Sequence, residues 1–200
     1  MTPKGKKKSK SKAKKSIEDL SLESQEFFEE MKKETDRGVA LIGAEFINAI
    51  LEQVLKSHFI DNAKHVNALL KKNQPLGSLW SRSEIAYCIG LLPEPTFHDL
   101  DLIRQIRNEF AHNYVAQTFD SEIIENLCLK LKSPDITLNI IRLIWKDACL
   151  DNRDRYIASI VSISDLLIRI GRKLRRCESP KLTLHFRRFG RPAKETHKQD

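Results

Sequence analysis

The sequence predicts an all-α fold, a single bundle of about six helices with a flexible basic arm at each end. Between the arms, apolar residues recur at spacings of three and four, and no run alternates with the period of two that indicates a strand. With 200 residues, 40% of them hydrophobic, the chain is long enough for one ordinary core and short for two. We expect a helical domain at residues 16–176, a disordered basic arm at 1–15 and a basic tail at 177–200.

The first two helices follow from their apolar spacing. Residues 16–34 are acidic and amphipathic, and Ser16 is a suitable N-cap. Residues 36–60 predict a longer helix, one face of which must be buried because it carries Val39, Ile42, Phe46, Ile50 and Val54. The opposite side carries a polar stripe, typical of a solvated face, that consists of Glu45, Asn48 and Glu52.

Prolines and glycines divide the middle of the chain. Pro75 and Gly77 interrupt the helical pattern, and a short apolar helix is expected directly after them, at residues 81–92. Pro93 and Pro95 are expected to stop that helix, because proline removes a backbone donor and disfavours a helical residue before it.

The next helix, expected at about residues 96–114, contains the most unusual residues of the chain. Asp99 and Asp101 lie near its N-terminus, where the helix dipole favours acids. Its core stripe consists of Leu100, Ile103, Ile106, Phe110 and Tyr114. A further helix is expected from Asp120 to about Leu131, and a shorter segment after Pro134. The last helix, 153–176, is apolar over so wide an arc that we expect it at the centre of the bundle or at a subunit contact.

Composition excludes several classes of protein. Four cysteines lie apart from one another and from any histidine cluster, which predicts buried or free thiols in a reducing cytoplasm: Cys88, Cys128, Cys149 and Cys177. No stretch approaches the roughly 20 uninterrupted apolar residues of a membrane span. There is no glycine-rich phosphate loop, and His58 and His65 are interpreted as surface residues and not as metal ligands. We therefore expect a cytoplasmic protein without a membrane segment, a metal or a cofactor.

Positive charge is concentrated at the two ends. Residues 1–15 carry eight Lys and no acid, residues 172–200 carry ten Lys or Arg against three acids, and residues 16–171 carry 17 basic against 24 acidic side chains. Basic arms can bind phosphate backbones without sequence preference, and the alternatives are a solubilising tail or a segment docked on the acidic body. The candidate nucleic-acid contacts are Lys6, Lys7, Lys8, Arg187, Arg188 and Arg191.

Two roles are open for Arg107, Asn108 and His112. On a helix Asn108 and His112 share a face, so the amide can fix the imidazole tautomer, whereas Arg107 lies about 140° away from His112. A ribonuclease site needs both, brought together by an unwound helix or a two-fold dimer. The histidine would then be a general acid or base, and the arginine would stabilise the phosphorane without a metal. The alternative is a set of helix-end caps and ion pairs, which residue types alone favour.

Several blocks of the chain resemble the mannitol operon repressor (MltR) family, in the order that the family has them. They are ETDRGVALIGAEFINAILEQVL, QPLGSLWSRSEIAYCIGLL, IRQIRNEFAH and RDRYIASIVSISDLLIRIGRKLRR, and together they span about residues 36–176. The resemblance implies an all-helical transcriptional regulator of the repressor type, without its own helix-turn-helix. Such a regulator acts through protein contacts or through nonspecific nucleic-acid binding. The Lys-rich start and the Arg-rich end depart from enteric members, so mannitol itself is not inferred.

The segment from Arg107 to Tyr114 also resembles the signature of HEPN-superfamily ribonucleases, including HepT-like toxins. This resemblance implies catalytic Arg107 and His112, a supporting Asn108, and Tyr114 as a modification site. Our first hypothesis is therefore a non-enzymatic MltR-like regulator, a homodimer with a protein partner in a regulatory system. The alternative is a metal-independent endoribonuclease with its site at the dimer interface, and a third hypothesis is an antitoxin or assembly partner of a toxin.

Overall fold

The computed structural model describes residues 30–113, 117–133 and 151–178. In these ranges the helices are α2 Asp36–His58, α3 Ala63–Leu70, α4 Leu79–Cys88, α5 Glu94–His112, α6 Glu122–Cys128 and α8 Asn152–Lys173. The described part of the chain has no strand, so the predicted all-α class is confirmed. Most of the helix expected at 16–34, the segment after Pro134 and both basic arms lie outside the described residues.

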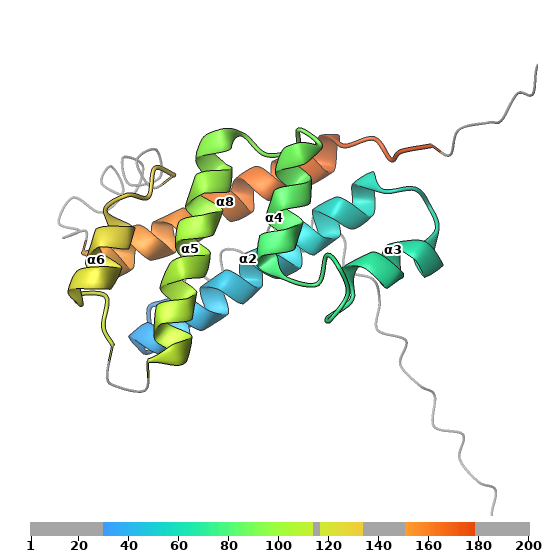
Figure 1. The fold of residues 1–200 in the computed structure, drawn as a ribbon. Coiled ribbons are helices and arrows are strands. Elements are labelled where there is room, and N and C mark those ends of the chain that lie inside the picture. The colour runs from blue at the N-terminus through green and yellow to red at the C-terminus, as the bar shows by residue number, and fades with distance from the viewer. Residues whose placement is uncertain (1–29, 114–116, 134–150, 179–200) are drawn as a thin grey trace, which may run out of the picture.

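The helices form two layers with a short helix at either end. α2 and α8 make the rear layer in Figure 1, α4 and α5 cross in front of it, and α3 and α6 lie at opposite ends. α2 and α8 run in the same direction, as contacts at both ends show. At their starts Asp36 and Arg153 form an ion pair of 3.2 Å. At the other end, the backbone N–H of Cys177, after α8, donates to the carbonyl of His58, the last residue of α2, at 2.7 Å. α8 therefore packs along the length of α2, and its buried residues extend from Tyr156 to Gly171.

The buried face of α2 is rotated from the predicted one. Ile42 is 43% exposed and Phe46 is half-buried, whereas the smaller Gly43 and Ala44 face the core. A Cβ added at Gly43 would lie 3.2 Å from side-chain atoms of Ile160 and of Tyr156, which shows how closely α8 approaches there. The prediction was wrong at Ile42 because it followed the large apolar side chains and ignored the small ones that allow helices to approach.

α2 also has the length and composition of a membrane span, with a mean hydropathy of 1.5 in its most apolar window. Half of that window is buried inside the described structure. Packing against α8 accounts for this composition, since a central core helix needs the same apolar residues.

Three helix boundaries near the proline residues differ from the prediction. α4 begins at Leu79, where the side chains of Ser78 and Ser81 form a capping box. It ends at Cys88, before Gly90, whose φ of 75° lies in the left-handed region that glycine favours. α5 begins at Glu94, so Pro95 lies in its first turn, where proline is tolerated, and does not stop the preceding helix. The short helix α3 was not predicted.

A buried arginine joins the Pro-Leu-Gly turn to α2. Arg82 is 3% exposed, and its Nη1 donates to Asn48 Oδ1 while its Nη2 donates to Glu52 Oε2, both at 2.6 Å. Its remaining donors reach three carbonyl oxygens, those of Leu76 at 2.9 Å, Leu70 at 2.7 Å and Asn48 at 3.2 Å. The prediction of a solvated stripe was therefore wrong for Asn48 and Glu52, which are half-buried partners of this guanidinium.

Two aspartates attach loops to the bundle. Asp99 is fully buried, and its carboxylate accepts the backbone N–H of Ser133 at 2.6 Å and that of Lys132 at 3.0 Å. Its role is therefore to hold the loop after α6, which a general preference for acids near a helix N-terminus does not predict. Asp36 accepts the backbone N–H of Phe119 at 3.1 Å, which fixes the chain after α5 against α2.

Burial changes the titration of two core side chains. It raises the pKa of the Cys128 thiol from 9.0 to about 12, an effect that Arg155 partly opposes. Burial likewise raises the pKa of the Tyr156 phenol, which donates to the Ala40 carbonyl at 2.9 Å. Above pH 9 the unfolded chain releases the Cys128 proton while the folded chain keeps it, so the free energy of unfolding falls as pH rises.

Replacing Cys128 with alanine is expected to flatten this fall. The thiol contributes a slope of about 1.4 kcal/mol per pH unit between roughly pH 9 and 11, in addition to the contribution of Tyr156 at the upper end. Urea unfolding of the wild type and of Cys128→Ala across this range measures the difference. The control is Cys88→Ala, because Cys88 is exposed, and equal slopes in the two variants would contradict the prediction.

Candidate functional site

The structure brings together two of the three motif residues. Arg107 Nη1 donates to Asn108 Oδ1 at 3.1 Å on the surface of α5. His112 is the exposed last residue of α5, and its side chain has no hydrogen bond or ion pair with another described residue. Asn108 thus pairs with Arg107 and not with His112, which corrects the expected amide–imidazole pair. α5 stays helical through His112, so within the described chain no unwinding brings Arg107 to His112. Tyr114 lies outside the described residues.

Other residues hold the end of α5. Arg37 of α2 donates through Nη2 to the Asn113 carbonyl at 2.6 Å, and Asn113 Nδ2 donates to Glu109 Oε2 at 2.8 Å. The predicted alternative role of Arg107 and His112 was to cap this helix end. Among the described residues, the arginine that caps it is Arg37, so the motif residues keep their side chains on the surface.

Arg107 and Asn108 line a cleft between α2, the turn before α4, and α5. Its volume is about 300 Å³. The polar side chains in its wall are those of Glu45, Asn48, Ser78, Arg104, Arg107 and Asn108, with Trp80 beside them. We call this space the α2–α5 cleft. The buried Arg82 fixes one residue of this wall, because its guanidinium donates to Asn48 Oδ1.

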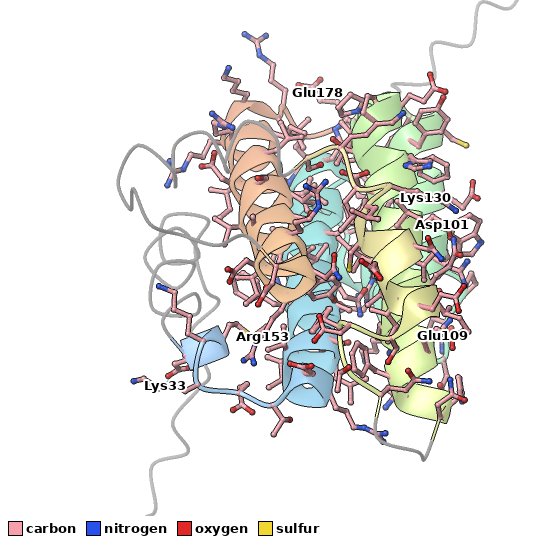
Figure 2. All side chains as sticks on the ribbon, turned by 90° about the vertical axis from the view of Figure 1, so that its left-hand side faces the viewer. Lys33, Asp101, Glu109, Lys130, Arg153 and Glu178 are labelled. Carbon is pink, nitrogen blue, oxygen red and sulfur yellow. The ribbon has the colours of Figure 1, made fainter. Side chains whose placement is uncertain are left out.

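The other side of Asn108 borders a second depression, between α5 and α6. Glu109, Lys130 and the exposed Ile123 line it, and its volume is about 440 Å³. Figure 2 shows Glu109 and Lys130 with Asp101 on this side of the molecule, away from Lys33. Asp101 does not line it; its carboxylate accepts from Arg104 at 2.6 Å and 2.9 Å and from Gln105 Nε2 at 2.8 Å.

An exposed aromatic cluster lies next to the α2–α5 cleft. The rings of Tyr87 and Phe97 stack with centroids 4.6 Å apart, and the Trp80 ring is tilted 5.9 Å from Phe97. Arg104 lies over the Trp80 ring, with its guanidinium carbon 5.0 Å from the centroid. Trp80, Tyr87 and Ile89 are each 38–39% exposed. We call Trp80, Tyr87 and Phe97, together with the exposed Ile89 directly after α4, the α4–α5 aromatic face.

The other residues considered in the sequence are the possible metal ligands, the histidines and the basic arms. The described residues hold no group of three or more His, Cys, Asp or Glu side chains that could bind a metal ion. His65 is exposed as predicted, whereas His58 is half-buried, with its Nε2 3.5 Å from Cys177 Sγ. All six basic arm residues lie outside the described structure, as does Cys149.

The fold, the polar cleft and the aromatic face define an all-helical protein in which a polar cleft lies beside an exposed aromatic cluster. The family model described as Mannitol repressor, MtlR, matches residues 23–150, which is more than half of the chain. The chain therefore belongs to the mannitol repressor family, and it is an MtlR-like regulator. The resemblance to this family found in the sequence is confirmed, whereas the comparisons do not show the HEPN-like resemblance.

A solved structure shows the same fold. It is a chain from the X-ray structure of the MtlR-HPr complex from Escherichia coli, with 17% sequence identity and a TM-score of 0.57. The alignment covers 72% of this chain and 97% of that one. No curated protein sequence matches. These comparisons support the repressor-type regulator, and they give no support to the ribonuclease alternative.

Proposed function

We propose that this regulator acts by binding a protein partner of the HPr type through the α4–α5 aromatic face. The observation that carries the proposal is the gathering of Trp80, Tyr87 and Phe97 with Arg104 on one exposed surface. Tyrosine, tryptophan and arginine are the residues most enriched at binding hot spots. A similar fold has been solved in a complex with HPr, which supports a protein of that kind as the partner.

The other exposed apolar side chains suit a partner less well. Ile123 and Leu129 on and beside α6 are 57% and 58% exposed, but α6 itself contains no aromatic residue. The rings of the aromatic face are already ordered by stacking, so binding would cost little conformational entropy there. The aromatic face is therefore the better anchor.

Replacing Tyr87 and Ile89 together by alanine is expected to weaken partner binding. Truncating hot-spot residues costs about 2 kcal/mol or more, or roughly thirtyfold in Kd. Calorimetric titration with HPr from the same organism measures it. The matched control is the double variant Ile123→Ala and Leu129→Ala, which removes a similar exposed apolar area. If the control variant weakens HPr binding and the aromatic-face variant does not, the aromatic face is not the binding surface.

The basic arms and the assembly belong to this proposal as expectations. Lys6, Lys7 and Lys8, with the arginines at the other end, would add nonspecific affinity for nucleic acid. We place the protein in the cytoplasm as a homodimer. No second function is proposed, because no comparison supports a ribonuclease and α5 stays helical through His112.

A further inference from the structure

The α5 wall of the α2–α5 cleft has donors that the protein does not use. Arg107 is exposed, and among the described residues it donates only to Asn108. Arg104 donates to Asp101 through Nε and Nη2, and its Nη1 has no described partner. The two guanidinium groups start three residues apart on one helix, which places them on neighbouring turns. Such a pair suits a phosphate group, whose oxygens accept paired bonds from arginine.

The α2 wall carries a carboxylate that is already held in position. Glu45 Oε2 accepts from Asn48 Nδ2 at 3.3 Å, and Asn48 is itself fixed by Arg82. Glu45 Oε1 has no donor among the described residues. A carboxylate repels a bare anion but accepts hydrogen bonds from hydroxyl groups. Trp80 adds an aromatic surface on the same cleft.

From this distribution of charge we propose that the α2–α5 cleft binds a small phosphorylated polyhydroxy compound, such as a sugar phosphate or a sugar-alcohol phosphate. The phosphate lies on Arg104 and Arg107, and hydroxyl groups donate to Glu45. The cleft, at about 300 Å³, matches the lower end of small-molecule sites. This site goes beyond the proposed function. It shares Trp80 and Arg104 with the aromatic face, but Tyr87 and Ile89, the residues that test partner binding, do not line the cleft.

The test is calorimetric titration of the full-length protein with four probes: glucose 6-phosphate, mannitol 1-phosphate, unphosphorylated mannitol and inorganic phosphate. We expect saturable binding of at least one phosphate ester, about tenfold or more tighter than either inorganic phosphate or mannitol. Arg107→Gln should weaken it by at least about tenfold, as expected when a hydrogen bond to a charged group is lost. Arg172→Gln is the control, since it removes the same charge from the exposed end of α8.

Glu45→Gln separates a polyhydroxy ligand from a simple anion. The amide keeps the size of the side chain but loses charge and half of its acceptor capacity, so binding of the phosphate ester should weaken by about fivefold. At a site for anions alone, removing the carboxylate would tighten binding. Thermal melting of each variant checks that the fold is intact.

Three results would overturn the proposal. They are the absence of saturable binding to both phosphate esters, an equal effect of Arg172→Gln and Arg107→Gln, and tighter ester binding in Glu45→Gln. None of them bears on partner binding, which is measured with variants outside the cleft, so the two proposals fail separately.

Discussion

Replacing Arg82 by methionine is expected to lower the free energy of unfolding by about 3 to 5 kcal/mol, because several acceptors lose one shared charged donor, at roughly 1–3 kcal/mol for each acceptor left buried without a partner. The change leaves the Asn48 side chain and the carbonyls of Leu70 and Leu76 without their donor. Lys56 stays paired with Glu52, so most of the loss comes from the uncompensated amide and carbonyl oxygens. A loss of this size is a large share of the 5–15 kcal/mol that holds a typical domain folded.

Urea unfolding of Arg82→Met and of two further variants tests this prediction. Arg82→Lys restores a charge beside Glu52 but not the planar fork, so its stability should lie between the wild type and Arg82→Met. Arg172→Met removes an exposed arginine from α8 and should stay within about 0.5 kcal/mol of the wild type. If Arg82→Met unfolds at the wild-type urea concentration, Arg82 does not anchor the turn to α2.

The helices themselves were largely predictable, because apolar periodicity is a local property. The stripe of Leu100, Ile103, Ile106 and Phe110 is buried as expected, since these spacings place side chains on one face of a helix. Periodicity of bulky residues failed at Ile42, where the contact is made by small residues. It also missed α3, whose eight residues are too few to show a period.

The partners of polar side chains could not be predicted from the sequence. Arg82 and Asn48 are 34 residues apart, and Asp99 accepts backbone donors 33 and 34 residues away. Such pairs depend on how helices pack, which spacing along one helix does not contain. The signal that was present at Arg82 was a charged residue on the apolar side of a short helix, where burial requires partners.

The candidate site was likewise predicted only in part. The sequence singled out Arg107 and Asn108, and both line a cleft. It did not indicate Trp80 or Glu45 as their neighbours, because these come from other parts of the chain, and it overlooked Arg104, which lies three residues before Arg107 on the same helix. The sequence also suggested a histidine partner for Asn108 from ideal helix geometry, whereas the adjacent Arg107 provides the closer donor.

The second large effect concerns gene regulation. If the regulator acts through its aromatic face, the double variant Tyr87→Ala and Ile89→Ala should lose regulation almost completely while remaining folded. The expected cause is loss of the protein contact and not of an active site. His112→Ala should keep full regulation, because the exposed His112 side chain has no hydrogen bond or ion pair with another described residue and is given no role in partner binding.

The most direct test measures the transcripts that change when the gene is deleted, in strains complemented with the wild type, the double variant or His112→Ala. The account predicts that wild type and His112→Ala restore repression and that the double variant leaves these genes as active as in the deletion strain. Restored repression with the double variant, together with loss of regulation in His112→Ala, would contradict a protein-contact regulator and favour RNA cleavage.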